Sequence, residues 1–406
     1  MTTVWPINSD QDGEPVAAAA LSILLFAGIL TLWVPYRWAV SLFQTGAFAL
    51  AIAWAVRFAL RPCTVKGSLL LIPLSGALLW GMAQLTFGET VYRWETWTAL
   101  LKWGTNLILF FLALQVFPET GPRRRFLRVV LYFGAALSVV ATVQMHSSEG
   151  RVFWLFPTGY KDFVLGPFVY RNQFAGFIEL VMPLALVGAL EDRRRMPACA
   201  AIVAVLYASV IASASRAGTF LVSAEIILIL ILALRRNTTR GSNWALTLGL
   251  LVAFVVTCAA VVGSGALWRR FLLPDPYVVR REFLQSSLAM IRDRPWMGFG
   301  LGTWSTAYPG YAVYDNGMFA NQAHNDWAQW TVEGGLPFLL LMLSIAAASV
   351  GPALRSLWGI GVIAVFVHSL VDYPLERPEL AGFFFVFLGV VESARQSQMS
   401  RQSQRD

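Results

Sequence analysis

Long apolar runs recur along this chain of 406 residues. A helix of about 17 or more apolar residues is long enough to cross the hydrocarbon core of a bilayer. Hydrophobic residues make up 57% of the chain and charged residues 13%, against about a quarter charged in soluble domains. The sequence therefore predicts an all-α polytopic membrane protein, with residues 1–406 as a single membrane-embedded domain. Roughly twelve transmembrane helices are expected, near residues 16–34, 38–60, 68–86, 97–117, 127–145, 173–190, 197–213, 218–234, 244–264, 335–353, 357–371 and 377–392.

Short arginine-bearing segments separate many of these runs. The predicted cytoplasmic loops are residues 61–66, 118–126, 191–196 and 235–243, because Lys and Arg are enriched in loops that stay on the cytoplasmic side. Both termini then lie in the cytoplasm. The net charge of +8 is concentrated in clusters beside apolar runs, which argues against nucleic acid as a partner. The polar N-terminus lacks a positive n-region, so we expect no cleavable signal peptide.

Two of the expected extracytoplasmic segments are long. Residues 146–172 join the fifth and sixth spans, and residues 265–334 form a loop of roughly 70 residues, longer than structureless connections usually are. Within this loop, Leu284, Leu288 and Ile291 follow the i, i+4, i+7 spacing of an amphipathic helix. We expect that helix to lie on the membrane surface or on the helix bundle.

The segment AHNDWAQW places polar side chains just before an apolar run. Asp326 followed by Gln329 fits a helix start with Asp326 as the N-cap residue. His324 precedes it, where the positive end of the helix dipole favours a neutral imidazole while Asp326 favours the charged form. A neutral imidazole suits a general base. The alternative is that His324 has no catalytic role and is simply a polar residue before the helix at the membrane interface.

Several arginines are expected on the same side of the membrane. Arg216 stands at the boundary between two apolar runs, Arg171 begins another, and Arg280 and Arg281 lie in the long loop. An arginine at membrane depth has to find an anion, a carbonyl group or water. Since no acidic cluster matches them, these arginines favour an anionic ligand such as a diphosphate.

A buried ion pair is the alternative for Arg216, because Glu179 and Glu225 lie within expected spans and could hold helices together by pairing with it. The glycine run GFGLG at residues 298–302 follows no predicted strand, so it is expected to form a tight turn rather than a dinucleotide site. No spacing of His, Cys and Glu fits zinc. We predict neither a metal nor a cofactor.

Four segments in this order resemble the O-antigen ligase and polymerase superfamily of bacterial envelope enzymes: GPFVYRNQFAGFIELVMPLAL, SASRAG, RREFLQSSLAMIRDRPWMGFGLGTW and AHNDWAQWTVEGGLPF. The resemblance implies an inverting, metal-independent glycosyltransferase of the membrane-embedded C type. Such enzymes move a glycan from a polyprenyl (undecaprenyl) diphosphate carrier to an acceptor sugar, which is lipid A core for ligases and another lipid-linked repeat for polymerases. The implied location is the bacterial inner membrane, with the active site on the periplasmic side.

The resemblance also implies roles for single residues. His324 corresponds to the histidine thought to deprotonate the acceptor hydroxyl, and Arg216 and Arg280 to the two arginines thought to hold the diphosphate. Arg171 and Arg281 are further candidates for the diphosphate. The candidate supporting residues are Asn172, Asn325, Asp326 and Glu333.

Other functions stay open at this point. The segments FVYRNQFAG and SSEGRVFWLFPTG are similar to polymerase-like members, so a polymerase of lipid-linked repeats is the main alternative to the ligase that we favour. A transporter of about twelve spans would favour broken helices, internal repeats and polar groups at the midplane. A non-catalytic scaffold would tolerate replacement of His324 and Arg216.

Overall fold

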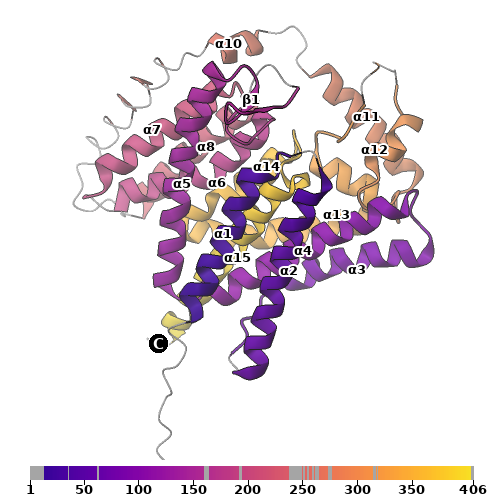
Figure 1. Ribbon diagram of the computed structural model, residues 1–406, viewed down its shortest axis with the longest axis horizontal. Helices are drawn as coiled ribbons and strands as arrows, with labels where there is room; N and C mark the ends of the chain where they lie inside the picture. The colour runs from indigo at the N-terminus through magenta and orange to yellow at the C-terminus, as the bar shows by residue number, and fades with distance from the viewer. Residues whose placement is uncertain are drawn as a thin grey trace, which may run out of the picture.

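The computed structural model describes residues 13–34, 36–61, 64–159, 164–191, 194–236, 265–272, 277–313 and 319–403, together with residues 249, 252, 253, 256, 257, 260 and 317. Its regular structure is almost entirely helical (Figure 1). The strands in the described part, β1 (Arg151–Val152) and β2 (Phe156–Pro157), form one short antiparallel hairpin. The fold agrees with the expected all-α class.

The helices follow the apolar runs of the sequence. The α-helices are α1 (Gly13–Thr31), α2 (Arg37–Leu60), α3 (Leu71–Phe87), α4 (Arg93–Val116), α5 (Thr120–Ser147), α6 (Arg171–Glu191), α7 (Met196–Ala212), α8 (Arg216–Arg235), α10 (Gly265–Phe271), α11 (Val278–Asp293), α12 (Trp304–Ala307), α13 (Asp326–Arg355), α14 (Ile360–His368) and α15 (Pro378–Ser403). Short 3-10 helices are η1 (Tyr308–Gly310), η2 (Leu357–Gly359) and η3 (Pro374–Glu376).

Eleven of the expected spans coincide with these helices, and the span expected at 244–264 lies largely outside the described residues. Within the described part, six helices are long and apolar enough to cross a membrane: α2, α4, α5, α6, α8 and α13. The apolar parts of α1, α3, α7 and the η2–α14 segment are shorter.

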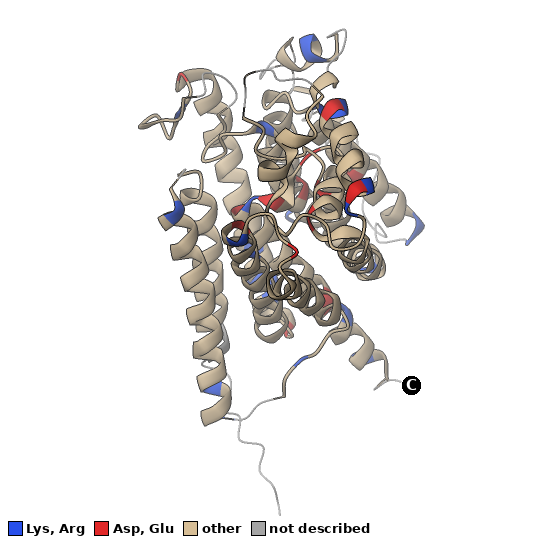
Figure 2. Cartoon of the chain, turned by 90° about the vertical axis from the view of Figure 1, so that its right-hand side faces the viewer, with Lys and Arg blue, Asp and Glu red and all other residues tan. Residues whose placement is uncertain are grey.

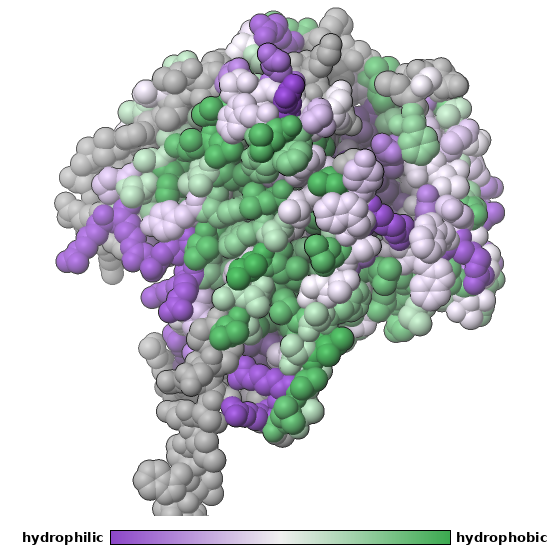
Figure 3. All heavy atoms as spheres, viewed as in Figure 1, coloured by the Kyte–Doolittle hydropathy of each residue, from purple (hydrophilic) through white to green (hydrophobic). Residues whose placement is uncertain are grey.

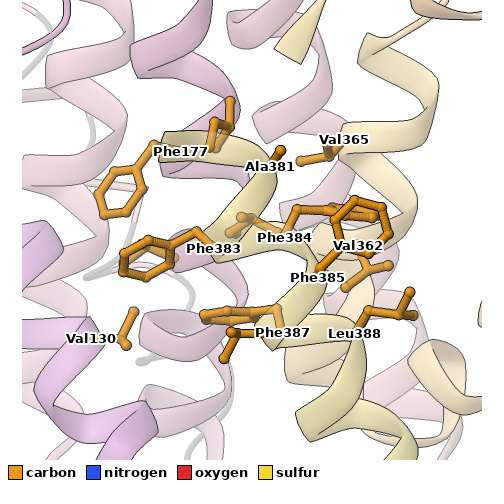
Figure 4. Packing of buried hydrophobic residues seen from close by; sticks show 14 of the residues in the cluster. Val130, Phe177, Val362, Val365, Ala381, Phe383, Phe384, Phe385, Phe387 and Leu388 are labelled. Carbon is orange, nitrogen blue, oxygen red and sulfur yellow. The ribbon is translucent and has the colours of Figure 1, made fainter. Parts of the chain in front are cut away.

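The core of the bundle lies around α15, which packs against α4 and α6. Phe383, Phe384, Phe385 and Phe387 point in different directions from α15 and are all buried, as the close view in Figure 4 shows. The ring of Phe177 from α6 meets Phe383 edge to face, with centroids 5.3 Å apart. A helix that is apolar on every side has to be surrounded by other helices, which explains the central place of α15.

Apolar side chains also cover one outer face of the molecule. Figure 3 shows this face as a broad hydrophobic band over α1 and α5, with hydrophilic side chains gathered at its ends. Ile23, Val139 and Val143 are among the exposed residues of these two helices. Long stretches of helix carry no charged residue (Figure 2). Such a surface is stable in contact with lipid rather than water.

The two ends of the bundle differ in the segments they carry. α5 begins, and α6 and α8 end, at segments expected to be cytoplasmic. The opposite ends of α6 and α8 carry Arg171 and Arg216. Arg171 and Arg216 therefore lie at the end of the bundle away from these arginine-bearing segments.

α11 is the amphipathic helix expected in the long loop, and of its expected stripe Ile291 packs inward while the two leucines are exposed. Leu284 and Leu288 are 39% and 43% exposed, whereas Phe283 and Met290 are buried in a small cluster with Trp304. The aromatic and methionine side chains fill the core of the loop itself, and this turns the leucines outward. The leucine stripe therefore does not pack on the bundle.

The glycine run forms the tight turn that the sequence predicts. Gly298, Gly300 and Gly302 have φ values of 67°, 106° and 78°, which non-glycine residues rarely adopt. The turn lies directly on α13, because the Gly300 amide donates to the carbonyl oxygen of Glu333 at 2.9 Å. A Cβ atom on Gly298 would lie 2.5 Å from that same oxygen. The turn thus fixes the long loop to the helix that follows His324.

Candidate active site

His324 lies two residues before α13, in a left-handed backbone conformation with φ of 53°. Asn325 is the N-cap of this helix, since its side-chain oxygen accepts a hydrogen bond from the Ala328 amide at 3.0 Å. The prediction of Asp326 as the N-cap is therefore wrong by one residue. The backbone of Asn325 is extended, whereas Asp326 is already helical, so only Asn325 can accept from the first turn.

The freed carboxyl group of Asp326 has a different task. It is buried and accepts hydrogen bonds from the Ser369 hydroxyl at 2.8 Å and from the Leu375 amide at 3.0 Å. Its own amide donates to the carbonyl oxygen of Ser369 at 2.9 Å. These bonds join the start of α13 to the segment between α14 and α15, which carries Asp372.

Asp372 is buried beside His324. One carboxylate oxygen accepts a hydrogen bond from Arg280 at 2.7 Å and another from Asn172. The other oxygen lies 3.6 Å from Nδ1 of His324. Burial alone would raise the pKa of Asp372, but the His324 ring and the Arg280 guanidinium outweigh it and hold this pKa well below its ordinary value. An ionised carboxylate therefore faces the imidazole.

Aromatic rings enclose the imidazole of His324. Phe283 stacks on it at 5.9 Å between centroids, and Tyr373 and Tyr170 meet it edge to face at 4.8 Å and 6.0 Å. The His324 side chain is still 25% exposed. The rings thus hold the imidazole in one orientation while part of it stays accessible.

Tyr170 connects the aromatic wall to the polar groups. Its hydroxyl accepts hydrogen bonds from Asn172 at 3.1 Å and from Arg280 at 3.4 Å. Burial, together with the charge of Asp372, raises the pKa of Tyr170. The phenol therefore stays neutral near pH 7 and serves as a polar contact for Arg280.

A cavity of about 400 Å³ shares Asn172 and Arg280 with this cluster. Arg216, Arg270 and Arg280 line it, and no carboxylate does among the described lining residues. Its apolar wall consists of Ala217, Phe220, Leu221, Phe271, Val367, Leu370 and Val371. A cavity that combines guanidinium groups with apolar side chains suits an anion attached to a hydrocarbon chain.

The arginines of this cavity are held by backbone and aromatic groups. Arg216 donates to the carbonyl oxygen of Arg270 at 3.1 Å, and its guanidinium lies 4.5 Å from the ring centre of Tyr277. Arg270 donates to the carbonyl oxygen of Ala214 at 2.6 Å. Burial, followed by the charges of Arg171 and Arg216, lowers the pKa of Arg270 to about 10. Guanidinium groups that repel one another in this way favour the binding of an anion.

The first turn of α8 ties Arg216 to the cluster around Asp372. Ser215 is the N-cap of α8, accepting from the Gly218 amide at 3.2 Å. Its hydroxyl also donates to the side-chain oxygen of Asn172 at 2.7 Å. Asn172, which the sequence suggests only as a supporting residue, therefore bridges α8 to Asp372.

The remaining predicted residues Arg171, Arg281 and Glu333 do not line the cavity. Arg171 begins α6, and its charge acts on Arg270, but it does not line the cavity. Arg281 is exposed on α11 and does not line the cavity either. Of the two adjacent arginines of α11, Arg280 is the one that faces both Asp372 and the cavity.

Glu333 belongs to the glycine turn rather than to the cavity. Its carboxylate accepts hydrogen bonds from the Gly302 amide at 2.8 Å and from the Gln329 side chain at 3.0 Å. It therefore fastens the long loop to α13, which is a structural task.

Glu179 and Glu225 were alternative partners for Arg216, and neither has that place here. Glu179 pairs with His368 instead, at 2.7 Å, and both side chains are completely buried. Glu225 is also buried, and within the described part of the chain its carboxylate has no hydrogen-bond partner.

Sequence reasoning missed Asp372 and Arg270. Asp372 is the acidic residue directly after the short apolar run at 357–371, in VDYP, and this position was a usable signal. Arg270 stands at the start of the long loop in LWRRF, where the adjacent Arg269 gave no means of choosing between the two. Only the packing of α10 against α7 and α8 identifies Arg270.

Comparison with known proteins finds a protein family whose model matches part of this chain. Residues 176–343 match the family model described as O-antigen ligase (Wzy_C). The matched stretch contains His324, Arg216 and Arg280, and it ends before Asp372. No curated protein matches the chain. Within the described ranges, no group of three or more His, Cys, Asp or Glu side chains is arranged to hold a metal ion.

Proposed function

The chain is a member of the O-antigen ligase superfamily, and on that premise we propose that it transfers a glycan from a polyprenyl diphosphate carrier to an acceptor sugar, with lipid A core as the acceptor. The reaction inverts the anomeric carbon, needs no metal ion or cofactor, and takes place on the periplasmic face of the bacterial inner membrane. The protein's own partners would then be the lipid-linked donor, the acceptor glycolipid and the surrounding lipids.

One observation carries this proposal. His324 lies 3.6 Å from the carboxylate of Asp372, and Asp372 pairs with Arg280, which lines a cavity that holds guanidinium groups and apolar side chains together. A diphosphate attached to a polyprenyl chain has the matching composition, since its anionic head needs arginines and its tail needs an apolar wall. Arg280 belongs to both parts, because it pairs with Asp372 and lines the cavity.

The chemistry is a direct displacement. The acceptor hydroxyl oxygen attacks the anomeric carbon of the donor while the bond from that carbon to the diphosphate oxygen breaks. His324 takes the proton of the hydroxyl as general base. The leaving diphosphate keeps the bonding electrons, and Arg216, Arg270 and Arg280 stabilise its developing charge.

Asp372 has two roles in this proposal. Its carboxylate faces Nδ1 of His324, which leaves Nε2 as the nitrogen for the acceptor hydroxyl. After proton transfer, the same negative charge stabilises the imidazolium. The separation of 3.6 Å between Nδ1 and the carboxylate is expected to shorten when substrate fills the site.

The test uses purified protein in lipid nanodiscs with a polyprenyl-diphosphate-linked glycan. One reaction contains lipid A core and another contains no second acceptor. We expect one shifted glycolipid band that requires lipid A core. A ladder formed without the core would make the protein a polymerase, and no product in either reaction would favour a transporter or a scaffold.

Two variants accompany this experiment. His324→Ala should abolish the product, whereas His146→Ala should leave it unchanged, because His146 is exposed on α5 and lies outside the cavity. Full activity of His324→Ala would remove the proposed base even if the product were the expected one.

A further inference from the structure

A second cavity, of about 740 Å³, opens at the opposite end of the bundle. Seven arginines line it, together with Glu191 as the one carboxylate among the described lining residues. Arg123, Arg124 and Arg128 come from the first turns of α5, and the others from the ends of α8 and α13, from α15 and from the residue before α7. Figure 3 shows hydrophilic side chains at this end of α5, next to the apolar band.

Part of this positive charge is explained by the fold itself. Arg123 donates to the carbonyl oxygen of Phe117 at 3.3 Å, and Arg236 donates to that of Leu354 at 2.6 Å. These arginines satisfy carbonyl groups at the ends of α4 and α13, where a positive charge is also favoured by the helix dipole. Capping of this kind needs no ligand.

Three other arginines are not explained in this way. Among the described residues, the guanidinium groups of Arg124, Arg128 and Arg355 have no hydrogen-bond partner and no ion pair, although each lines the cavity. Glu191 can balance only one of these charges. All three residues are exposed at this end of the molecule, and guanidinium groups that face one space repel one another less when an anion lies between them.

The same cavity has an apolar wall. Leu127, Leu131, Leu184 and Val187 line it; Leu127 lies between Arg124 and Arg128 on α5, and Leu131 lies one turn farther along this helix. Trp358 and Tyr132 also line it, and such amphipathic rings are typical of the level of lipid headgroups. A soluble anion would use the arginines and leave these side chains without a partner.

We infer that this cavity binds the headgroup of an anionic phospholipid from the membrane leaflet on that side, with its phosphate among Arg124, Arg128 and Arg355 and its acyl chains along the leucines. Basic pockets between transmembrane helices hold such headgroups in other membrane proteins. The site lies at the other end of α5 and α6 from His324, so the inference stands independently of the proposed transferase reaction.

The test measures binding of a fluorescent phosphatidylglycerol to the full-length protein in mixed detergent micelles. We expect at least about tenfold weaker binding when Arg124, Arg128 and Arg355 are all changed to Gln. The matched control changes Arg61, Arg125 and Arg235 to Gln, which removes the same charge from the same end of the protein outside the cavity. The control should bind within about twofold of the wild type.

Competition identifies the ligand class. Unlabelled phosphatidylglycerol should displace the probe, whereas phosphatidylethanolamine and inorganic phosphate should not. Equally weakened binding of the probe in both triple variants would mean that the basic surface attracts anionic lipid in general. Displacement of the probe by inorganic phosphate would show a site for soluble anions. Either result overturns the inference. If the triple variant does not fold, Arg128→Gln alone should weaken binding about threefold, and unchanged binding would count against the site.

Discussion

Two histidine–carboxylate pairs lie at the same end of this molecule, and they differ in access. His324 and Asp372 are separated by 3.6 Å, and the imidazole is 25% exposed. His368 and Glu179 are separated by 2.7 Å, and both side chains are completely buried between α14 and α6. The closer pair is the one that no substrate can reach.

The comparison shows that residue type and distance do not locate a reactive group. In the buried pair, close packing brings α14 so near to α6 that a Cβ atom on Gly361 would lie 2.3 Å from the Glu179 carbonyl oxygen. No room for a ligand remains there. In the accessible pair, aromatic rings hold His324 without sealing it. We therefore assign chemistry to the looser pair and helix packing to the tighter one.

The largest effect is expected for His324→Ala. Loss of a general base should reduce the rate of glycan transfer by about 10²–10⁴-fold. The temperature of unfolding should change little, because the ring is partly exposed and its Nδ1 makes no hydrogen bond in the described structure. Product formation and thermal unfolding in detergent measure the two quantities. A large drop in the unfolding temperature with normal transfer would reverse our assignment of the two pairs.

His368→Ala should behave in the opposite way. It leaves Glu179 buried without its partner, which should lower the free energy of unfolding by about 3 kcal/mol. The double variant Glu179→Gln/His368→Ala should be less destabilised than the sum of the two single changes, because no lone charge remains buried. Chemical denaturation of the three variants measures this difference. Additive losses would mean that the two side chains do not interact.

Asp372→Asn should reduce the rate of transfer by about 10–100-fold, since the amide cannot stabilise an imidazolium. The wild-type pKa of Asp372 is below its value in the unfolded chain, so this carboxylate stabilises the fold above about pH 4 and loses its effect as the pH falls through the folded value. As the pH is lowered, the free energy of unfolding should therefore fall less in Asp372→Asn than in the wild type. An unchanged rate would leave His324 without the proposed partner.

The smallest expected effect is a difference in KM between variants of the two adjacent arginines of α11. Arg280→Ala should raise KM for the lipid-linked donor about tenfold, because Arg280 lines the cavity and pairs with Asp372. Arg281→Ala should change KM less than about twofold, because this exposed residue does not line the cavity. Steady-state kinetics over a range of donor concentrations measure both. Equal effects would indicate a general attraction of anions to the loop.

Local features of the sequence account for the helices and for several site residues. Apolar runs of membrane-spanning length predict the long apolar helices of the described part, since hydrocarbon forces the backbone to satisfy its own hydrogen bonds. His324, Arg216 and Arg280 can be selected because each stands in a short polar segment beside an apolar run. The turn at residues 298–302 can be predicted from its glycines alone.

The sequence does not decide which residue takes a position where neighbouring residues of one type compete for it. Asn325 and Asp326 are both good N-caps, and a difference of one residue in the backbone conformation selects Asn325. Leu284 and Phe283 are both apolar, and the aromatic cluster of the loop decides that Phe283 is buried. Periodicity does not resolve such choices, because it records the spacing of apolar residues and not the shape of the surface that receives them.

Amino-acid order alone thus determines the membrane class, the long apolar helices and the histidine before α13. Tertiary structure decides that Asp372, Arg280 and Asn172 meet at that histidine, although they are more than 40 residues from it or from one another along the chain. The helices form from contacts within a few residues. The site forms only when α6, α11, α13 and the segment after α14 pack together, and their relative positions depend on all the side chains between them.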